Sequence, residues 1–313
     1  MEILKNLAAF VIRFSGLGYA IRETAGRRNV TVVLYHRPQP DRFRRHLEYM
    51  GRRYRFIRLD ELVDALHNGD WSKIPPRALV MTFDDGMKET FALLGMFREY
   101  GVTPTFYVST GVVGTGRRFW FSPCSCGDVT KLRAMPGAAR REMLKGTGFE
   151  RETDYPGREA LSREEISGMK ACVDFQSHGR FHEPLTSCSL NEKSDEIKGS
   201  MEEMEKLTGR PALHFSFPHG DYDEADIEML KWCGYRSART VDCGRNGPDA
   251  DPYRLKITGV NDNASVTLLA ADLSGIIGWL GKLRRGSLTG RHAAKPARDV
   301  NRIFALGKGL RRI

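Results

Sequence analysis

The sequence predicts an α/β fold with parallel strands, arranged either as a barrel or as a doubly wound sheet. Strand-like and helix-like runs alternate along most of the chain, at the spacing that repeated strand–helix units require. With 313 residues, the chain is long enough to bury a full-sized core. His or Asp residues follow four of the expected strands, where α/β proteins carry their reactive groups.

The expected strands are short runs rich in β-branched and other apolar residues. They cover residues 29–36, 77–83, 102–110, 172–177, 212–218 and 235–240. The expected helices have apolar side chains at the spacing of one helical face, and several of them end at a glycine. They cover residues 41–54, 59–69, 87–101, 161–171, 190–209 and 224–234.

Three segments depart from this alternation. Residues 111–160 are rich in Gly, Pro, Cys and charge, which predicts an irregular insertion in the domain formed by residues 29–262. Residues 1–28 carry apolar side chains at helical spacing and predict an amphipathic N-terminal helix. Residues 263–313 predict a basic, amphipathic C-terminal tail. The fold therefore has a helical extension at each end.

The charge balance indicates an acidic partner. Forty-nine Lys and Arg residues against 39 Asp and Glu give a net charge of +10, and after Lys282 the only acid is Asp299. Nucleic acid is disfavoured because no nucleic-acid-binding motif accompanies the charge. Apolar residues beside basic clusters in the tail are typical of an interfacial helix on anionic lipid. A helix packed on the barrel with a solvated basic face is the alternative.

The cysteines and the N-terminus bear on location. Six cysteines in a chain of this length do not form a disulfide framework, and Cys124 and Cys126 lie too close in sequence for a typical zinc site. Arg13 interrupts the N-terminal apolar run, whereas the apolar region of a signal peptide is continuous. No run approaches the roughly 20 apolar residues that span a bilayer. We expect a cytoplasmic protein, or one peripheral to the inner face of the membrane.

Two groups of residues point to a catalytic site. Asp84 and Asp85 follow the strand 77–83, and their like charges repel unless they lie in solvent or face a cation. His178 and His182 are four residues apart, so a helical turn or a tight loop lets both imidazoles reach one metal ion. Two His and one carboxylate leave a coordination position open for water. Surface histidines, and a phosphate or magnesium site at the Asp pair, are the alternatives.

Three motifs resemble those of a known family. The stretches "TFDDG" (82–86), "SHGRFH" (177–182) and "SFPHG" (216–220) are similar in order and spacing to those of the polysaccharide deacetylases of the NodB-homology class, carbohydrate esterase family 4. The resemblance covers roughly residues 30–262. It implies a distorted (β/α) barrel that holds Zn²⁺, or another divalent cation such as Co²⁺ or Ni²⁺, and hydrolyses N-acetyl groups from amino sugars.

The resemblance also implies roles for residues. Asp84 corresponds to the general base, and Asp85, His178 and His182 correspond to the metal ligands. Two features depart from the family pattern. Ser216 stands where many members carry an Arg that orients the catalytic aspartate. The late Leu-x-x-His motif that supplies a general acid in the family is not evident. His219 and His36 are then the candidates for the group that protonates the leaving amine. Alternatively, His219 is only a wall of the cleft.

Three hypotheses of function follow. The first is a metal-dependent hydrolase that removes N-acetyl groups from the amino sugars of a cell-envelope or exopolysaccharide glycan, or of its lipid-linked precursor. The second is a deformylase of a lipid-linked formamido sugar. The third is a catalytically weak, glycan-binding member of the family, which the missing late histidine favours.

Overall fold

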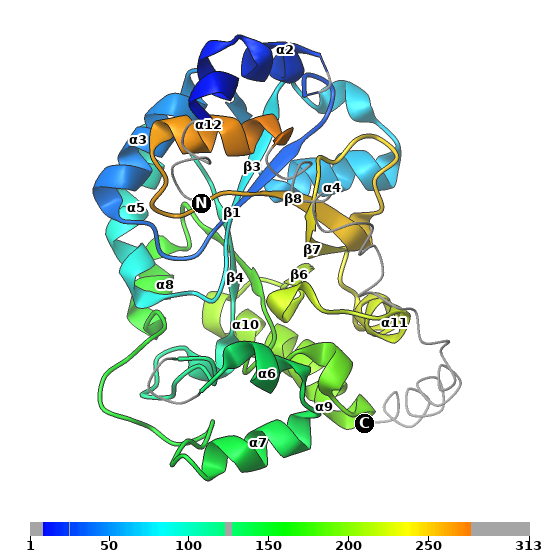
Figure 1. The fold of residues 1–313 in the computed structure, drawn as a ribbon. Coiled ribbons are helices and arrows are strands. Elements are labelled where there is room, and N and C mark those ends of the chain that lie inside the picture. Colours follow the sequence, from blue (N-terminus) through cyan, green and yellow to red (C-terminus); the bar gives the residue numbers. More distant parts are fainter. Residues whose placement is uncertain (1–8, 25, 123–126, 277–313) are drawn as a thin grey trace.

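The computed structural model describes residues 9–24, 26–122 and 127–276 (Figure 1). Eight strands pair in parallel within these residues. They are β1 (Thr31–Tyr35), β2 (Arg55–Phe56), β3 (Ala78–Phe83), β4 (Thr105–Val108), β5 (Asp174–Ser177), β6 (His214–Ser216), β7 (Ser237–Cys243) and β8 (Leu255–Gly259).

The sheet closes into a barrel because β1 pairs with both β3 and β8. Seven strands, β1 and β3 to β8, form the closed ring, and each pairs with the next one along the chain. β2 adds to the beginning of β3 outside this ring. The structure therefore selects the barrel from the two architectures that the alternation allowed.

Helices surround the barrel (Figure 1). Besides a helical segment over residues 9–14, the α-helices of the described residues are α2 (Leu17–Glu23), α3 (Pro40–Gly51), α4 (Leu59–Asn68), α5 (Leu94–Tyr100), α6 (Val129–Ala134), α7 (Gly137–Lys145), α8 (Arg163–Met169), α9 (Leu190–Ser194), α10 (Ser200–Thr208), α11 (Glu224–Cys233) and α12 (Val266–Ser274). One π-helical turn, Asp195–Gly199, joins α9 to α10. Short 3-10 helices cover Trp71–Lys73, Lys88–Leu93, Thr110–Val112, Leu185–Ser187, Pro218–Gly220 and Pro252–Arg254.

Alternate residues of the strands face two different cores. Val33 and Tyr35 of β1 belong to the larger core, which includes apolar residues of α3 and α5. Val32 and Leu34, with Val80 of β3, belong to a second core that fills the barrel and is continued by residues of α4. The side-chain period of two along a strand thus separates an outward face from an inward face.

A hydrogen-bond chain fixes α4 where β6 and β7 begin. His214, the first residue of β6, contacts the Ser237 hydroxyl at 2.9 Å and the Asp60 carboxylate in the first turn of α4 at 2.8 Å. Both His214 and Ser237 are fully buried. This end of the barrel is therefore closed by packing, and the opposite end, where the strands finish, carries the reactive residues.

The predicted strands and helices of residues 29–240 are present, with ends shifted by a few residues. β2 and β8 were not predicted. Residues 111–160, expected to be irregular, contain α6 and α7, and Trp120, Leu132 and Leu144 help form a small core of their own. The helices are short, so glycine, proline and charge obscured their amphipathic spacing.

The two ends of the chain are described in part. The described residues of the expected N-terminal helix form two helices, residues 9–14 and α2, separated at Gly16, which has a left-handed φ of 77°. α12 packs against α2 and α3. The basic tail beyond residue 276 and the Cys124–Cys126 pair lie outside the described residues. Among the helices that are described, none is long and apolar enough to cross a bilayer.

Candidate active site

The two adjacent aspartates leave β3 in different directions. Asp84 continues the strand, since its N–H donates to the Tyr35 carbonyl at 3.0 Å. Its position keeps it on the face of β3 that points into the barrel. Asp85 has a φ of 68°, in the left-handed region, and Gly86 follows with a φ of 76°. A side chain at Gly86 would meet Val108 at 2.7 Å, so the turn requires glycine.

The two metal-binding candidates after β5 lie on a tight loop and not on a helix. The buried Glu196 carboxyl group organises this loop by accepting hydrogen bonds from the backbone N–H groups of Arg180 at 2.8 Å and Phe181 at 3.0 Å. A Cβ at Gly179 would come within 2.6 Å of the Glu196 Oε2 atom. Glu196 lies in the π-helical turn, a feature that is frequent at functional sites.

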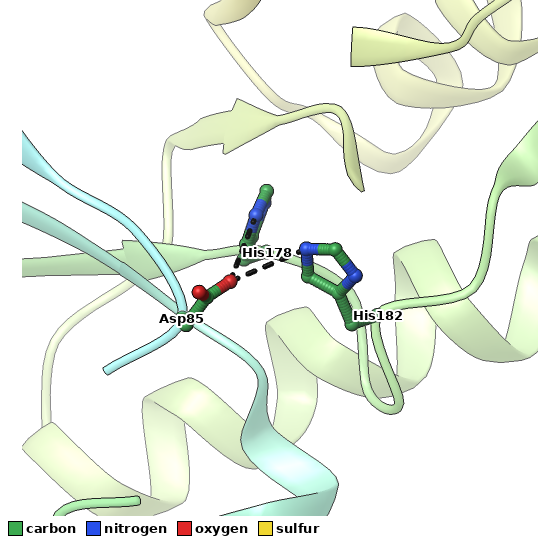
Figure 2. A group of neighbouring side chains, drawn as sticks. All are labelled: Asp85, His178 and His182. Atoms are coloured by element: carbon green, nitrogen blue, oxygen red, sulfur yellow. Dashed lines mark ion pairs between the residues drawn. The ribbon is translucent and has the colours of Figure 1, made fainter. Parts of the chain in front are cut away.

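Asp85, His178 and His182 converge on one point (Figure 2). One ligand atom from each lies within 4.8 Å of the others. The Asp85 Oδ1 atom is 3.2 Å from His182 Nε2 and 3.7 Å from His178 Nε2. The His178 Nδ1–H donates to the Ser216 carbonyl at 2.7 Å, which leaves Nε2 with its lone pair facing the cluster. All three residues are buried, and their geometry fits a divalent cation such as zinc.

The electrostatics of the cluster favour metal-binding protonation states. Burial lowers the pKa of His178 to about 4, so its imidazole is neutral near pH 7. Burial alone would raise the pKa of Asp85, but the hydrogen bond and charge of His182 hold it well below its usual range. His36 and His178 contribute to the same effect. A carboxylate and a neutral imidazole are the forms that bind a metal ion.

Asp84 is held by Arg239, a residue that we did not predict as part of the site. Arg239 lies on the inward face of β7 and is paired in register with Ser216 of β6. Its guanidinium donates to the Asp84 Oδ2 atom and, at 2.5 Å, to the Ser216 hydroxyl. The other carboxylate oxygen of Asp84 is buried and has no hydrogen-bond partner among the described residues. Asp84 therefore has one oxygen fixed and one oxygen free.

Strained backbone is concentrated here. Among the described residues other than glycine, four have a positive φ, and three of these are Asp85, His182 and His219. Each such conformation costs on the order of 1–3 kcal/mol and persists only where the surroundings impose it. The strain is consistent with side chains that are directed toward a shared centre.

The segment 111–160 forms one wall of the site. The Trp120 indole N–H donates to the backbone carbonyl of His182 at 2.9 Å. The His219 ring packs edge-on against His182, with ring centres 4.5 Å apart, and also contacts Trp120 and Phe121. The Arg133 guanidinium donates to the His219 carbonyl at 3.1 Å. The segment that looked irregular in sequence therefore positions both histidines.

Comparison with known proteins identifies the family. The family model described as polysaccharide deacetylase matches residues 72–238, more than half of the chain. This chain belongs to the polysaccharide deacetylase family. Its members are hydrolases of amide carbon–nitrogen bonds in glycans, and so this chain is an enzyme of that class. A search of curated proteins finds no match.

Solved structures of deacetylases share the barrel. A Streptococcus pyogenes deacetylase, PplD, in complex with acetate has a TM-score of 0.60 at 18% identity, covering 79% of this chain and 99% of that one. IcaB from Ammonifex degensii has a TM-score of 0.59 at 18% identity, covering 79% of this chain and 97% of that one. The Bacillus cereus polysaccharide deacetylase BC0361 has a TM-score of 0.56 at 20% identity, covering 79% of this chain and 69% of that one. These likenesses support the NodB-type (β/α) barrel.

The two candidate proton donors of this polysaccharide deacetylase, His219 and His36, differ in their burial. His219 is partly buried in the aromatic wall, and burial, followed by the charges of His182 and Arg133, lowers its pKa to about 2. His36 is exposed at the end of β1, where its backbone N–H donates to Asp262 at 3.0 Å. The contacts of His219 are those of a wall, whereas His36 is open to solvent.

Proposed function

We propose that this polysaccharide deacetylase is metal-dependent and removes N-acetyl groups from the amino sugars of a cell-envelope or exopolysaccharide glycan, or of its lipid-linked precursor. One observation carries the proposal. Three buried side chains that could hold a metal ion, Asp85, His178 and His182, converge beside a second carboxylate, Asp84, that has one oxygen without a hydrogen-bond partner among the described residues. The family supplies the class of substrate.

The residues divide the work of amide hydrolysis. When bound, a divalent cation makes water more acidic and polarises the acyl carbonyl. Asp85, His178 and His182 would hold it. The free Oδ1 atom of Asp84 would accept the proton of the attacking water, while the hydrogen bond from Arg239 to Oδ2 keeps the carboxylate oriented. A group on the other side of the cleft must protonate the leaving amine, and His36 and His219 are the candidates.

The test measures bound metal and acetate release together. The wild-type protein, loaded with zinc and freed of excess metal, is analysed for metal content and incubated with N-acetylated glucosamine oligomers. We expect about one metal per chain, with both metal content and acetate release lost in His178→Ala. His67→Ala is the matched control, because His67 is an exposed histidine whose contact is to the Arg236 carbonyl, away from the cluster.

Three outcomes separate the hypotheses. Unchanged metal content in His178→Ala would contradict the ligand assignment. Formate release from formylated amino sugars, without acetate release from acetylated ones, would assign the enzyme as a deformylase. Oligomer binding by the metal-loaded protein without release of either acid would indicate a glycan-binding member of the family.

A further inference from the structure

The N-terminal part of the described chain carries an unusual apolar surface. Of the nine large hydrophobic side chains that are exposed within the described residues, five lie within residues 10–19. Their exposed fractions range from 47% to 64%. They are Phe10, Val11, Phe14, Leu17 and Tyr19, and together they are called the N-terminal apolar face below. Exposed apolar side chains gathered in this way indicate an interaction site.

This face belongs to a segment that is docked on the barrel. Ala9 and Ile12, on the other side of the same helical residues, are buried against Ala271 of α12. The Arg13 guanidinium donates to the Thr267 hydroxyl at 2.7 Å. In Figure 1 the blue helices lie along α12 at one end of the molecule. The apolar face therefore points outward because the opposite side is anchored.

The surroundings of this face are cationic. Arg27 and Arg28 are exposed just beyond α2, and Glu23 is paired with both Arg22 and Arg77. The chain also leaves the described region here, since Ile276 packs against the small core that α12 shares with the N-terminal helical residues.

The residues that follow add most of the protein's charge. Residues 277–313 contain ten Lys and Arg residues and a single acid, Asp299, so they account for nine of the ten net positive charges. Positive charge beside exposed aromatic residues is the pattern of helices that lie in the interface of anionic membranes.

We propose that the N-terminal apolar face docks the enzyme on an anionic lipid bilayer. The five side chains would enter the interface between headgroups and acyl chains, and the cations of Arg27 and Arg28 would bind the anionic headgroups. A second copy of this face would bring cationic surroundings together and repel. An anionic surface complements all of these charges, and the proposal is independent of the substrate.

The test is cosedimentation of the full chain with vesicles. Wild-type protein is mixed with phosphatidylcholine vesicles, or with vesicles that also contain about one quarter phosphatidylglycerol, at low and high salt. We expect binding to the anionic vesicles that weakens at high salt. Phe10→Ser/Phe14→Ser should bind at least about tenfold more weakly, because two partly exposed phenyl groups no longer enter the bilayer.

A matched control replaces an equally exposed apolar residue elsewhere. Met143 is 57% exposed and belongs to α7, a helix that lies in Figure 1 at the other end of the molecule from α2 and α12. Met143→Ser should therefore bind vesicles as the wild type does. Equal binding by the Phe variant and the wild type, or no wild-type binding to anionic vesicles, would overturn the proposal. A wild-type dimer that the Phe variant converts to a monomer, without vesicle binding, would assign the face to a second copy.

Discussion

Ser216 and Arg239 face each other across the β6–β7 ladder, and the Arg239 guanidinium donates hydrogen bonds to both the Ser216 hydroxyl and the Asp84 carboxylate. Members of the family that the motifs resemble often carry an arginine at the position of Ser216, where it orients the aspartate. Here the same cation comes from the neighbouring strand, and the small serine leaves room for it. The departure at Ser216 is therefore compensated in the fold.

This relationship predicts that the serine at position 216 and the arginine at position 239 can exchange places with partial retention of activity and stability. Arg239→Ser should strongly reduce acetate release and destabilise the protein by about 3–5 kcal/mol, because Asp84 would remain as an unpaired buried charge. The double variant Ser216→Arg/Arg239→Ser should recover part of both losses, since its guanidinium starts from the facing position of the ladder. Thermal unfolding and kcat/KM of the two variants and the wild type measure the effect.

The control for the exchange is Arg254→Ser, which removes a partly exposed guanidinium that pairs with Glu224 and Asp251. Exposed ion pairs contribute little, so its stability should change by less than about 1 kcal/mol. A double variant no better than Arg239→Ser alone would show that Arg239 acts on Asp84 in a way that position 216 cannot replace.

A second prediction concerns the indole of Trp120. Trp120→Phe keeps the aromatic wall but removes the donor to the His182 carbonyl, so this loop should hold its imidazole less firmly. Mutation of groups that orient metal ligands commonly lowers metal affinity by about 10–100-fold. We therefore expect Trp120→Phe to bind zinc at least tenfold more weakly than the wild type. Competition with a chelator measures this affinity without any substrate.

Trp71→Phe provides the matched control. The Trp71 indole also donates to a backbone carbonyl at 2.9 Å, but that carbonyl belongs to Arg28 and not to a residue of the candidate metal site. Its zinc affinity should equal that of the wild type. If the two variants bind zinc equally well, then Trp120 has a packing role alone.

A third prediction is a pH dependence set by Glu196. Burial and the charge of Glu183 raise the pKa of Glu196 to about 8. Between about pH 4.5 and pH 8 the folded protein retains a proton that the unfolded chain releases, so this residue makes stability fall as pH rises through that range. Glu196→Gln keeps an oxygen that accepts the loop N–H groups and does not titrate. Its melting temperature should therefore decline less with pH.

Glu202→Gln separates this effect from a general loss of negative charge, because Glu202 is exposed on the neighbouring helix α10. Its melting temperature should follow the wild-type dependence on pH. Parallel curves for Glu196→Gln and the wild type would mean that Glu196 is not protonated in the folded protein over this range.

The parts of the site that were predictable from sequence share one property. Asp84, Asp85, His178 and His182 follow the ends of strands within short motifs, and the closure of a parallel barrel brings such ends together. The alternation of strands and helices predicted the fold class for the same reason, since both signals are local.

The residues that were missed depend on contacts between distant segments. Arg239 enters the site because β7 pairs with β6 in a register that places it opposite Ser216. Side chains alternate between the two faces of a strand. This alternation over residues 235–240, combined with the missing arginine at position 216, could have suggested Arg239 as part of the site. Trp120 enters because the segment that looked irregular folds against the loop after β5, and no spacing rule connects it with His182.

A fourth prediction distinguishes the two candidate proton donors. His219 is enclosed by Trp120, Phe121 and His182, and its pKa of about 2 leaves it uncharged near pH 7, so it has no imidazolium proton to give to a leaving amine. We expect His219→Phe to retain kcat within about tenfold. His36→Ala removes the exposed histidine at the end of β1 and should lower kcat by about 10²-fold with a smaller change in KM. Steady-state kinetics across pH on a soluble N-acetylated oligomer measures both. A hundredfold loss of kcat in His219→Phe, with His36→Ala close to the wild type, would instead make His219 the proton donor.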